Sequence, residues 1–301
     1  MHKILLAIDG SAPSMEAAGL LAHLPHHDSV DLTVLSVVQR PFIHSSYATG
    51  ELLEKAFERD KEFAEQSYAK VAEMFDGANA TVRHVVSEGP VGESIVDIAG
   101  ENDCDLVVVG AKGHSQIARL LLGSVSDHVA THASCSTLVV RPTGLRDSQR
   151  PIRVCLAFES SGSAIAALEE IAEVPWKTGA EFHLLTVETY LSDFIGQRIA
   201  DEGIEISSHY EAGLLQAKER LAEVAPGTKT HLDKGDHVVE GIVEFAEKNE
   251  VDLLIVGETP RSAVNRFLLG STSRYVLRHA PCSVWVTRNR SIQGIEKGEA
   301  S

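Results

Sequence analysis

The chain has 301 residues, 44% of them hydrophobic and 23% charged, which is typical of a folded globular protein with room for two domains. Its 27 lysine and arginine residues are outnumbered by 43 aspartate and glutamate residues, and the net charge of −16 disfavours nonspecific binding to nucleic acid. No apolar run has the length of a membrane span, and the N-terminal run becomes acidic too soon for a signal peptide, so we expect a cytoplasmic protein.

The first half of the chain alternates short apolar runs with amphipathic segments. The apolar runs predict buried strands at residues 3–8, 30–38, 81–86, 105–109 and 137–140. Apolar residues at helical spacing predict helices after Ser11 and over 53–75, 91–100 and 125–132. Strands that alternate with helices in this way imply an α/β fold, in which helices cover both faces of an open, parallel, Rossmann-like sheet.

A glycine pattern follows the fourth predicted strand, whose three consecutive valines indicate burial on both faces. Gly110 and Gly113 come next, and after nine further residues Gly123 and Ser124 open a helix. Because a helix start offers backbone N–H groups and a partial positive charge, the pattern is typical of a phosphate cradle built from main chain. The alternative is that these glycines only turn the chain and begin a helix, and spacing alone leaves both interpretations open.

The chain then repeats itself. Asp105-Leu106-Val107-Val108-Val109-Gly110 returns as Asp252-Leu253-Leu254-Ile255-Val256-Gly257, an offset of 147 residues (252 minus 105). Two further landmarks keep that offset: Leu-Leu-Gly-Ser at 121–124 and 268–271, and His-Ala-x-Cys at 132–135 and 279–282. Three landmarks at one offset indicate duplication. We therefore predict domains at 1–142 and 151–288, a polar linker at 143–150 and a disordered tail at 289–301.

Other side chains carry weaker patterns. The four cysteines lack CxxC spacing and lie in or beside apolar runs, so buried, reduced thiols are expected. His128 and His132 are four residues apart on one predicted helix, a spacing that can bind metal, but His132 recurs as His279 and a structural role is favoured. We predict no metal site, and no pattern of residues indicates a catalytic group.

These residues resemble the universal stress protein family over nearly the whole chain, as a tandem pair. Nucleotide-binding members of the family carry Gly-x-x-Gly, nine residues and then Gly-Ser or Gly-Thr, which the first half has complete from Gly110 to Ser124. An acidic residue after the first strand, here Asp9, is also familial, as are the end of the second strand at Val37 and the turn at 88–90. The resemblance implies a five-stranded sheet whose first and fourth strands are neighbours, with the ligand beyond their carboxyl ends.

The resemblance also implies an adenine nucleotide, ATP with or without Mg²⁺, in the first domain. Asp9 would accept the ribose hydroxyls, although it could instead cap a local turn. Val37 would contact adenine through its main chain, and Val109 through its side chain. Lys112, His114 and Arg119 could offset phosphate charge or simply be exposed to solvent. The expected binding residues are Ala7, Asp9, Val37, Val109, Gly110, Lys112, Gly113, Gly123, Ser124 and Val125.

The second half departs from the family pattern at two positions, Pro260 and Glu159. Pro260 stands where Gly113 stood, and proline has neither an N–H to donate nor a left-handed conformation. Glu159 replaces Asp9 with a longer side chain, and Glu258 adds negative charge beside the expected anion site. The remaining candidates in this half are Glu159, Val187, Gly257, Gly270 and Ser271, with Arg261 and Arg266 as less secure anion contacts. We expect the second domain to be degenerate, with a weaker ligand or a different one.

The sequence therefore favours an ATP-binding universal stress protein that acts as a nucleotide-dependent switch or sensor. One alternative is a slow ATP hydrolase or nucleotidyl transferase, and another is a scaffold that binds no nucleotide. The apolar edge strands at 137–140 and 283–286 suggest that the two halves pair as a pseudo-dimer, with a homodimer of chains and a regulatory protein as further partners.

Overall fold

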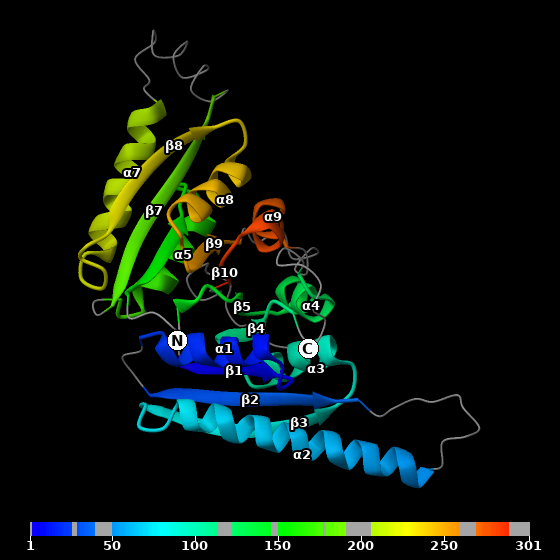
Figure 1. The fold of residues 1–301 in the computed structure, drawn as a ribbon. Helices are drawn as coiled ribbons and strands as arrows, with labels where there is room; N and C mark the ends of the chain where they lie inside the picture. Colours follow the sequence, from blue (N-terminus) through cyan, green and yellow to red (C-terminus); the bar gives the residue numbers. More distant parts are fainter. Residues whose placement is uncertain are drawn as a thin grey trace, which may run out of the picture. The chain divides into compact units, whose positions relative to one another are not determined.

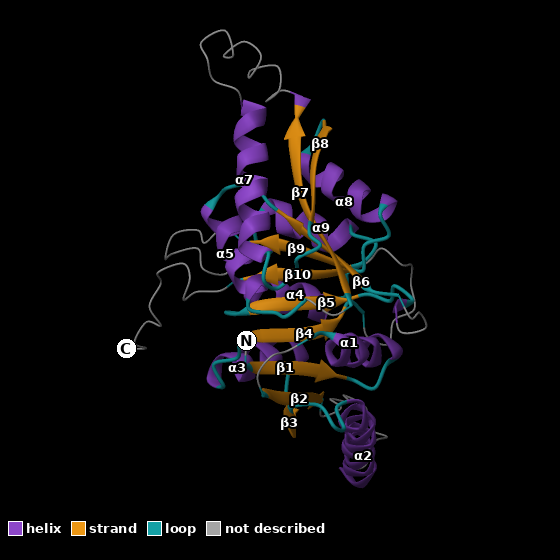
Figure 2. Ribbon diagram, turned by 90° about the vertical axis from the view of Figure 1, so that its left-hand side faces the viewer, coloured by secondary structure: helices purple, strands orange, loops and turns teal. Residues whose placement is uncertain are grey.

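The computed structural model describes residues 2–25, 29–39, 50–112, 122–145, 150–176, 179–190, 206–258 and 269–288. The chain divides into two compact units, Met1–Arg141 and Pro142–Ser301, which are coloured from blue to green and from green to red in Figure 1. Both units alternate strands with helices (Figure 2). The predicted tail at 289–301 lies outside the described residues.

The first unit contains a five-stranded parallel sheet in the order β3-β2-β1-β4-β5. Its elements are β1 Lys3–Ile8, α1 Ala12–His23, β2 Val30–Val38, α2 Gly50–Met74, β3 Ala80–Glu88, α3 Val91–Glu101, β4 Leu106–Gly110, α4 Ser124–His132 and β5 Ser136–Val140. Helices α1 and α2 pack together, as do α3 and α4, so right-handed crossovers place the two pairs on opposite faces. The strand order reverses at β1 and β4, which are neighbours as the family resemblance implied.

The second unit repeats this order as β8-β7-β6-β9-β10, again with parallel strands. Its elements are β6 Ile152–Ala157, α5 Gly162–Ala172, β7 Ala180–Thr189, α7 Ile206–Leu221, β8 Lys229–Gly235, α8 Val238–Lys248, β9 Leu253–Gly257, α9 Ser271–His279 and β10 Ser283–Thr287. Strands β6 and β9 are neighbours, as β1 and β4 are in the first unit. The α/β fold with two repeats of one sheet, predicted from the sequence, is confirmed.

Aliphatic side chains of the central strands form the core of each unit. Residues 106–108 of β4 and 253–255 of β9 are fully buried, because helices cover both faces of these strands. An aspartate then fixes the strand next to each: Asp105 Oδ2 accepts the N–H groups of His2 (2.7 Å) and Lys3 (3.0 Å). Asp252 Oδ2 does the same for the N–H group of Arg153 (2.9 Å). The acidic residue that opens each repeat motif therefore has a structural role.

Several local predictions can be compared with the structure. Ser11 caps α1 and Ser161 caps α5, each accepting a backbone N–H three residues on. Ser124 does not cap its own helix, because the N-cap of α4 is Gly123 and Ser124 is the first helical residue. His132 Nδ1 lies 2.8 Å from the His128 carbonyl oxygen, and His279 Nδ1 lies at the same distance from the Tyr275 carbonyl. Both histidines thus bond to their own helices.

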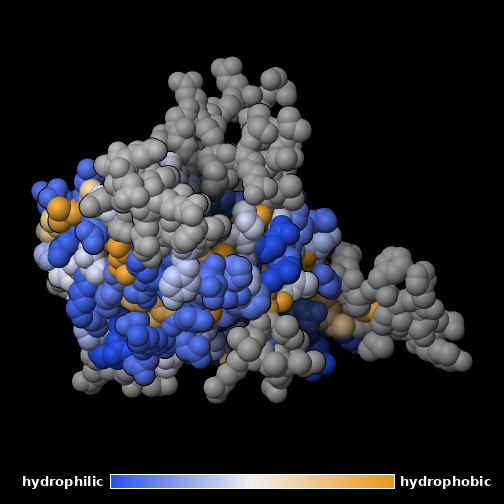
Figure 3. All heavy atoms as spheres, turned by 90° about the horizontal axis from the view of Figure 1, so that it is seen from above, coloured by the Kyte–Doolittle hydropathy of each residue, from blue (hydrophilic) through white to orange (hydrophobic). Residues whose placement is uncertain are grey.

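The surface and the thiols agree with the composition. On the face drawn in Figure 3, hydrophilic residues predominate among the coloured atoms. Within the described ranges, no helix combines the length and the apolar character that crossing a membrane requires. All four cysteines are buried, and burial raises the pKa of the Cys104 thiol to about 11. The burial of the thiols that the sequence predicts is therefore confirmed.

Candidate functional site

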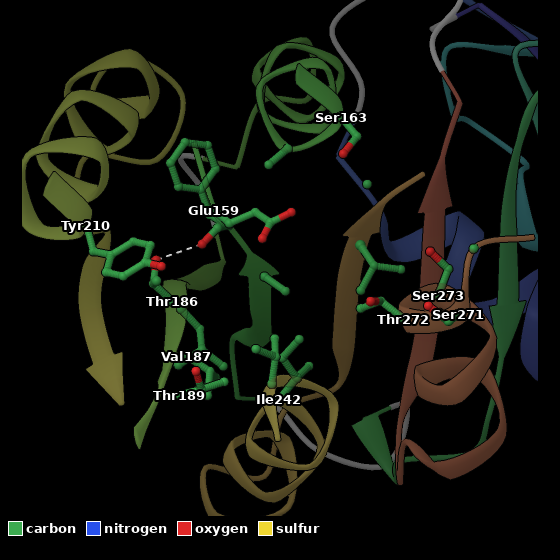
Figure 4. A pocket seen from close by; sticks show the side chains of 18 residues that line it. Glu159, Ser163, Thr186, Val187, Thr189, Tyr210, Ile242, Ser271, Thr272 and Ser273 are labelled. Atoms are coloured by element: carbon green, nitrogen blue, oxygen red, sulfur yellow. Dashed lines mark hydrogen bonds between the residues drawn. The ribbon is translucent and has the colours of Figure 1, made fainter. Parts of the chain in front are cut away.

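A cavity of about 200 Å³ lies in the second unit, where β6, β7 and β9 end and α9 begins (Figure 4). All five candidates named from the sequence in this half line it: Glu159, Val187, Gly257, Gly270 and Ser271. Ala157 and Val256, which correspond to Ala7 and Val109 of the first half, also line it. Residues separated by up to 116 positions in the chain (Ser273 and Ala157, 273 minus 157) therefore meet around one space, at the place where open parallel sheets bind ligands.

One wall of the cavity carries a carboxylate. Glu159 follows β6 by two residues and is exposed, and its carbonyl oxygen accepts the N–H group of Ser161, the residue that caps α5. Figure 4 shows Glu159 between Tyr210 on one side and Ser163 on the other. A carboxylate in this position can accept hydrogen bonds from a pair of ligand hydroxyl groups.

The opposite wall is mainly apolar and comes from β7, α7 and α8. Val187, Val238 and Ile242 line it, together with the ring of Tyr210. Helix α8 lies close to the strand here, because a Cβ atom on Gly241 would come within 2.8 Å of Val187 Cγ1. Thr186 Oγ1 donates a 2.6 Å hydrogen bond to the Phe158 carbonyl, which ties β7 to the end of β6 (dashed in Figure 4). An apolar slot of this kind suits a flat ring system.

The start of α9 forms the third wall. Its N-cap is Gly270, which makes no side-chain capping bond, and Ser271 and Thr272 in the first turn are exposed. The first N–H groups of a helix have no intrahelical partners, so this end favours an anion. Thr272 was missed in the sequence analysis, although the run Ser271-Thr272-Ser273 directly after Gly270 was a usable signal. The first unit has Val125 at this position, so the second unit offers one hydroxyl more.

The glycines at the strand ends have a packing role. A Cβ atom on Gly257 would lie 2.5 Å from the Ser163 carbonyl oxygen, and one on Gly110 would lie 2.8 Å from the main chain of Pro13. The first turn of α5 or α1 thus touches the strand where each glycine stands. Gly270 differs, because no described atom lies within 4 Å of the place where its Cβ would be. Gly257 and Gly110 are therefore required by the fold, whether or not a ligand also approaches them.

The concern that Glu258 adds uncompensated negative charge near the anion site is not borne out by the geometry. Arg288 Nε donates to Glu258 Oε2, and both side chains are nearly buried. The pair is thus close to neutral as a unit. Pro260, Arg261 and Arg266 lie outside the described residues.

The first unit brings its own candidates to the corresponding place. Asp9 follows β1 and Gly110 ends β4, and these strands are paired with Leu6 opposite Val108. The N–H group of Ser11 (3.0 Å) and its hydroxyl (2.5 Å) both donate to Asp9 Oδ1, so the local turn that the sequence left open does form.

The loop after β4 in this unit is fixed from the helix side. Ser126 Oγ donates to the Gly110 carbonyl (2.7 Å) and is 3.1 Å from that of Ala111. The N–H group of Gly123 donates to the Ala111 carbonyl (2.8 Å), so α4 begins directly beside the strand end. Ser124 is exposed at that start, and Val125 follows it. Gly113, His114 and Arg119 lie outside the described residues, whereas Lys112 is half-buried.

His128 and His132, which have a spacing that can bind metal, lie together on α4. The rings of His128 and His132 stack with their centroids 4.2 Å apart. Across the part of the chain that the structure describes, no group of three His, Cys, Asp or Glu side chains is arranged to hold a metal ion.

Comparison with known proteins agrees with the duplication. The model of the universal stress protein family matches residues 1–141 and again 152–288. A universal stress protein of Mycolicibacterium smegmatis is 26% identical over 299 residues, which cover 96% of this chain and 98% of that protein. Universal stress protein YxiE of Bacillus subtilis is 29% identical over 150 residues, covering 46% of this chain and 99% of the relative.

A solved structure shows the same fold. The universal stress protein from Archaeoglobus fulgidus DSM 4304 has a TM-score of 0.63 at 22% identity and covers 95% of this chain and 98% of its own. The two family matches, the full-length relative and this shared fold lead to one conclusion: the chain belongs to the universal stress protein family, as a tandem of two family domains.

Proposed function

We propose that this protein binds ATP in the first unit, between the ends of β1 and β4, and acts as a nucleotide-dependent switch or sensor in a stress response. We further propose that the cavity of the second unit holds an adenine nucleotide more weakly. The observation that carries the proposal is the convergence of Glu159, Val187, Gly257, Gly270 and Ser271 around a single cavity. The matching positions of the first unit have the complete glycine motif.

The chemistry of the walls supports this ligand class. A carboxylate at Asp9 or Glu159 can accept the two ribose hydroxyls, and the apolar wall at Val187 and Ile242 suits adenine. The helix start at Gly123 or Gly270 then presents N–H groups to the phosphates. In the first unit the Ser11 bonds to Asp9 Oδ1 orient the carboxylate before a ligand arrives.

The first test is the nucleotide content of the purified, denatured protein. The Gly113→Pro variant copies the second unit's loop into the first, and the Pro260→Gly variant does the reverse. We expect about one ATP per chain with the wild type, loss of ATP with Gly113→Pro, and a gain with Pro260→Gly. Absence of nucleotide from every sample, together with no binding of added ATP, would refute the proposal and favour a scaffold.

The switch role needs its own measurement. If ATP orders the segment after β4, limited proteolysis should be slower in that segment with ATP than without it, and equal rates would count against a switch. Turnover of ATP well above that of a Gly123→Val control would instead favour the hydrolase. Homodimerisation, a cytoplasmic location and a regulatory protein partner stay predictions.

A further inference from the structure

Two histidines of the second unit face each other across β7 and β8. His183 Nδ1 lies 2.9 Å from His231 Nε2, and the ring centroids are 5.1 Å apart. His183 is 5% exposed and His231 is half-buried. At this distance one nitrogen must donate a proton and the other must accept it, so the contact is made by two neutral rings or by one neutral and one charged ring. Protonation of both rings would put two N–H groups against each other.

The groups around the pair favour the neutral rings. Glu181 on β7 lies 3.7 Å from His183 Nε2, but it also pairs with Lys229 on β8 and with Arg153 on β6. Asp233 on β8 favours the charged form of His231 whereas Lys229 opposes it, and α8 presents the uncharged ring of Phe245. Burial lowers the pKa of both histidines, and the charge of His231 lowers that of His183 further. Protonation is therefore more costly in the folded unit than in the unfolded chain.

The pair is connected to the cavity through α8. The Phe245 ring is buried and packs against both imidazoles, with centroids 5.9 Å from His183 and 4.8 Å from His231. One turn earlier on the same helix, Ile242 lines the cavity, and Gly241 packs against Val187, which also lines it. Helix α8 thus carries both Phe245, which packs against the histidine pair, and Ile242, which lines the cavity.

We propose that the His183–His231 pair makes ligand binding by the second unit pH-dependent, because protonation of the pair weakens the packing of α8 on β7 and β8 and opens the apolar wall of the cavity. The ligand part of this inference rests on the proposed function of the cavity. The direction follows from the lowered pKa values of the two histidines. The neutral pair makes its full contribution to the free energy of unfolding when the pH is above the histidine pKa of the unfolded chain, about 6.5. This contribution decreases as the pH falls below the unfolded pKa, and it is lost once the pH is below the pKa values that the two histidines have in the folded unit.

The first unit supplies a matched comparison. Strand register aligns His183 with Thr33 and His231 with Val85, so the first unit has no titratable pair at this place. The variant with both His183→Thr and His231→Val therefore replaces the pair by residues that the same fold already accepts. Both tryptophans of the chain, Trp176 and Trp285, lie in the second unit, so tryptophan fluorescence reports unfolding of that unit alone.

The experiment compares thermal unfolding by tryptophan fluorescence at pH 7.5 and pH 5.5 in wild type, the double variant and an exposed-histidine control in the same unit, His209→Gln. We expect the change to pH 5.5 to lower the wild-type and control Tm by about 3 to 8 °C more than the Tm of the double variant. ATP affinity is measured in a Gly113→Pro background that silences the first unit. Between pH 7.5 and pH 5.5, the affinity should fall at least threefold more in the protein with the histidine pair than in the double variant. The titration of the ATP phosphates cancels in this comparison.

The outcomes separate the two proposals. Equal pH dependence of the Tm with and without the pair overturns the inference. A wild-type second unit that binds no ATP at pH 7.5 refutes instead the proposed function of its cavity, while the fluorescence still tests the packing of α8. Should the double variant not fold, NMR titration of the histidine ring protons in the wild type replaces it. Two histidines titrating clearly below pH 6.5, and shifted by His183→Gln, support the inference, whereas their absence overturns it.

Discussion

Replacement of Gly257 by alanine separates the packing role of a motif glycine from a ligand role. The new Cβ would lie 2.5 Å from the Ser163 carbonyl oxygen and 2.8 Å from its carbon, so the first turn of α5 must move. Overpacking of this kind costs about 1–3 kcal/mol, and the lower entropy of the unfolded chain returns about 0.4–1 kcal/mol. A net loss of about 1–2 kcal/mol should lower the Tm by about 2–8 °C in a unit of this size.

The matched variant is Gly270→Ala. Its Cβ meets no described atom within 4 Å and its φ of −58° suits any residue. The weaker N-cap and the stiffer unfolded chain roughly cancel, so the stability should change by less than about 1 kcal/mol. ATP affinity of the second unit should nevertheless fall, because the methyl group would stand at the helix end that faces the cavity. Thermal unfolding by tryptophan fluorescence and calorimetric titration measure the two effects. Equal stability of Gly257→Ala and wild type would refute the packing argument.

Three further changes test other contacts. Asp252→Asn should destabilise the second unit by about 2–4 kcal/mol in urea unfolding, because the buried carboxylate accepts Arg150 at 2.6 and 2.8 Å and an N–H group of β6; no change would show that these bonds are not needed. Thr272→Val, which copies the first unit's Val125, should weaken ATP binding in the second unit severalfold without lowering its Tm, and unchanged affinity would exclude a ligand role for the hydroxyl. Iodoacetamide at pH 8 should leave Cys104 and Cys155 unmodified until the protein unfolds, because burial raises the pKa of both thiols; rapid labelling of the native protein would contradict their burial.

The fold could be predicted because its signals are local and repeated. Consecutive valines at 107–109 imply a strand covered on both faces, and the offset of 147 residues implies that whatever fold the first half has, the second half has too. The predicted helices and strands of the first half differ from the observed ones at their ends. Ser124 has the right chemistry for an N-cap, but Gly123 takes that position, because its backbone is extended and its carbonyl accepts the first helical N–H group, that of Asp127.

Features that depend on side chains far apart in sequence could not be predicted. The sequence predicts that Glu258 adds a negative charge, because its partner Arg288 lies thirty residues later and no neighbouring residue indicates the pair. Tyr210 gave no signal, since only the packing of α7 brings it to the cavity. The His183–His231 contact has no motif at all, because it depends on the register of β7 against β8.

The motif glycines of the second unit differ in whether packing explains them, and this difference bears on the function of that unit. Gly257 would be retained in a copy that had lost its ligand, because the first turn of α5 touches it. Gly270 has no such contact among the described residues, yet it is retained, and exposed hydroxyls follow it at Ser271 and Thr272. Contacts among the described residues do not account for Gly270 and the two hydroxyls, whereas the anion that we propose at the start of α9 would. The second half thus differs from the first at Pro260 and Glu159 but has Gly-Ser at the start of the same helix, which is the pattern that we expect if the proposed site has an altered ligand preference.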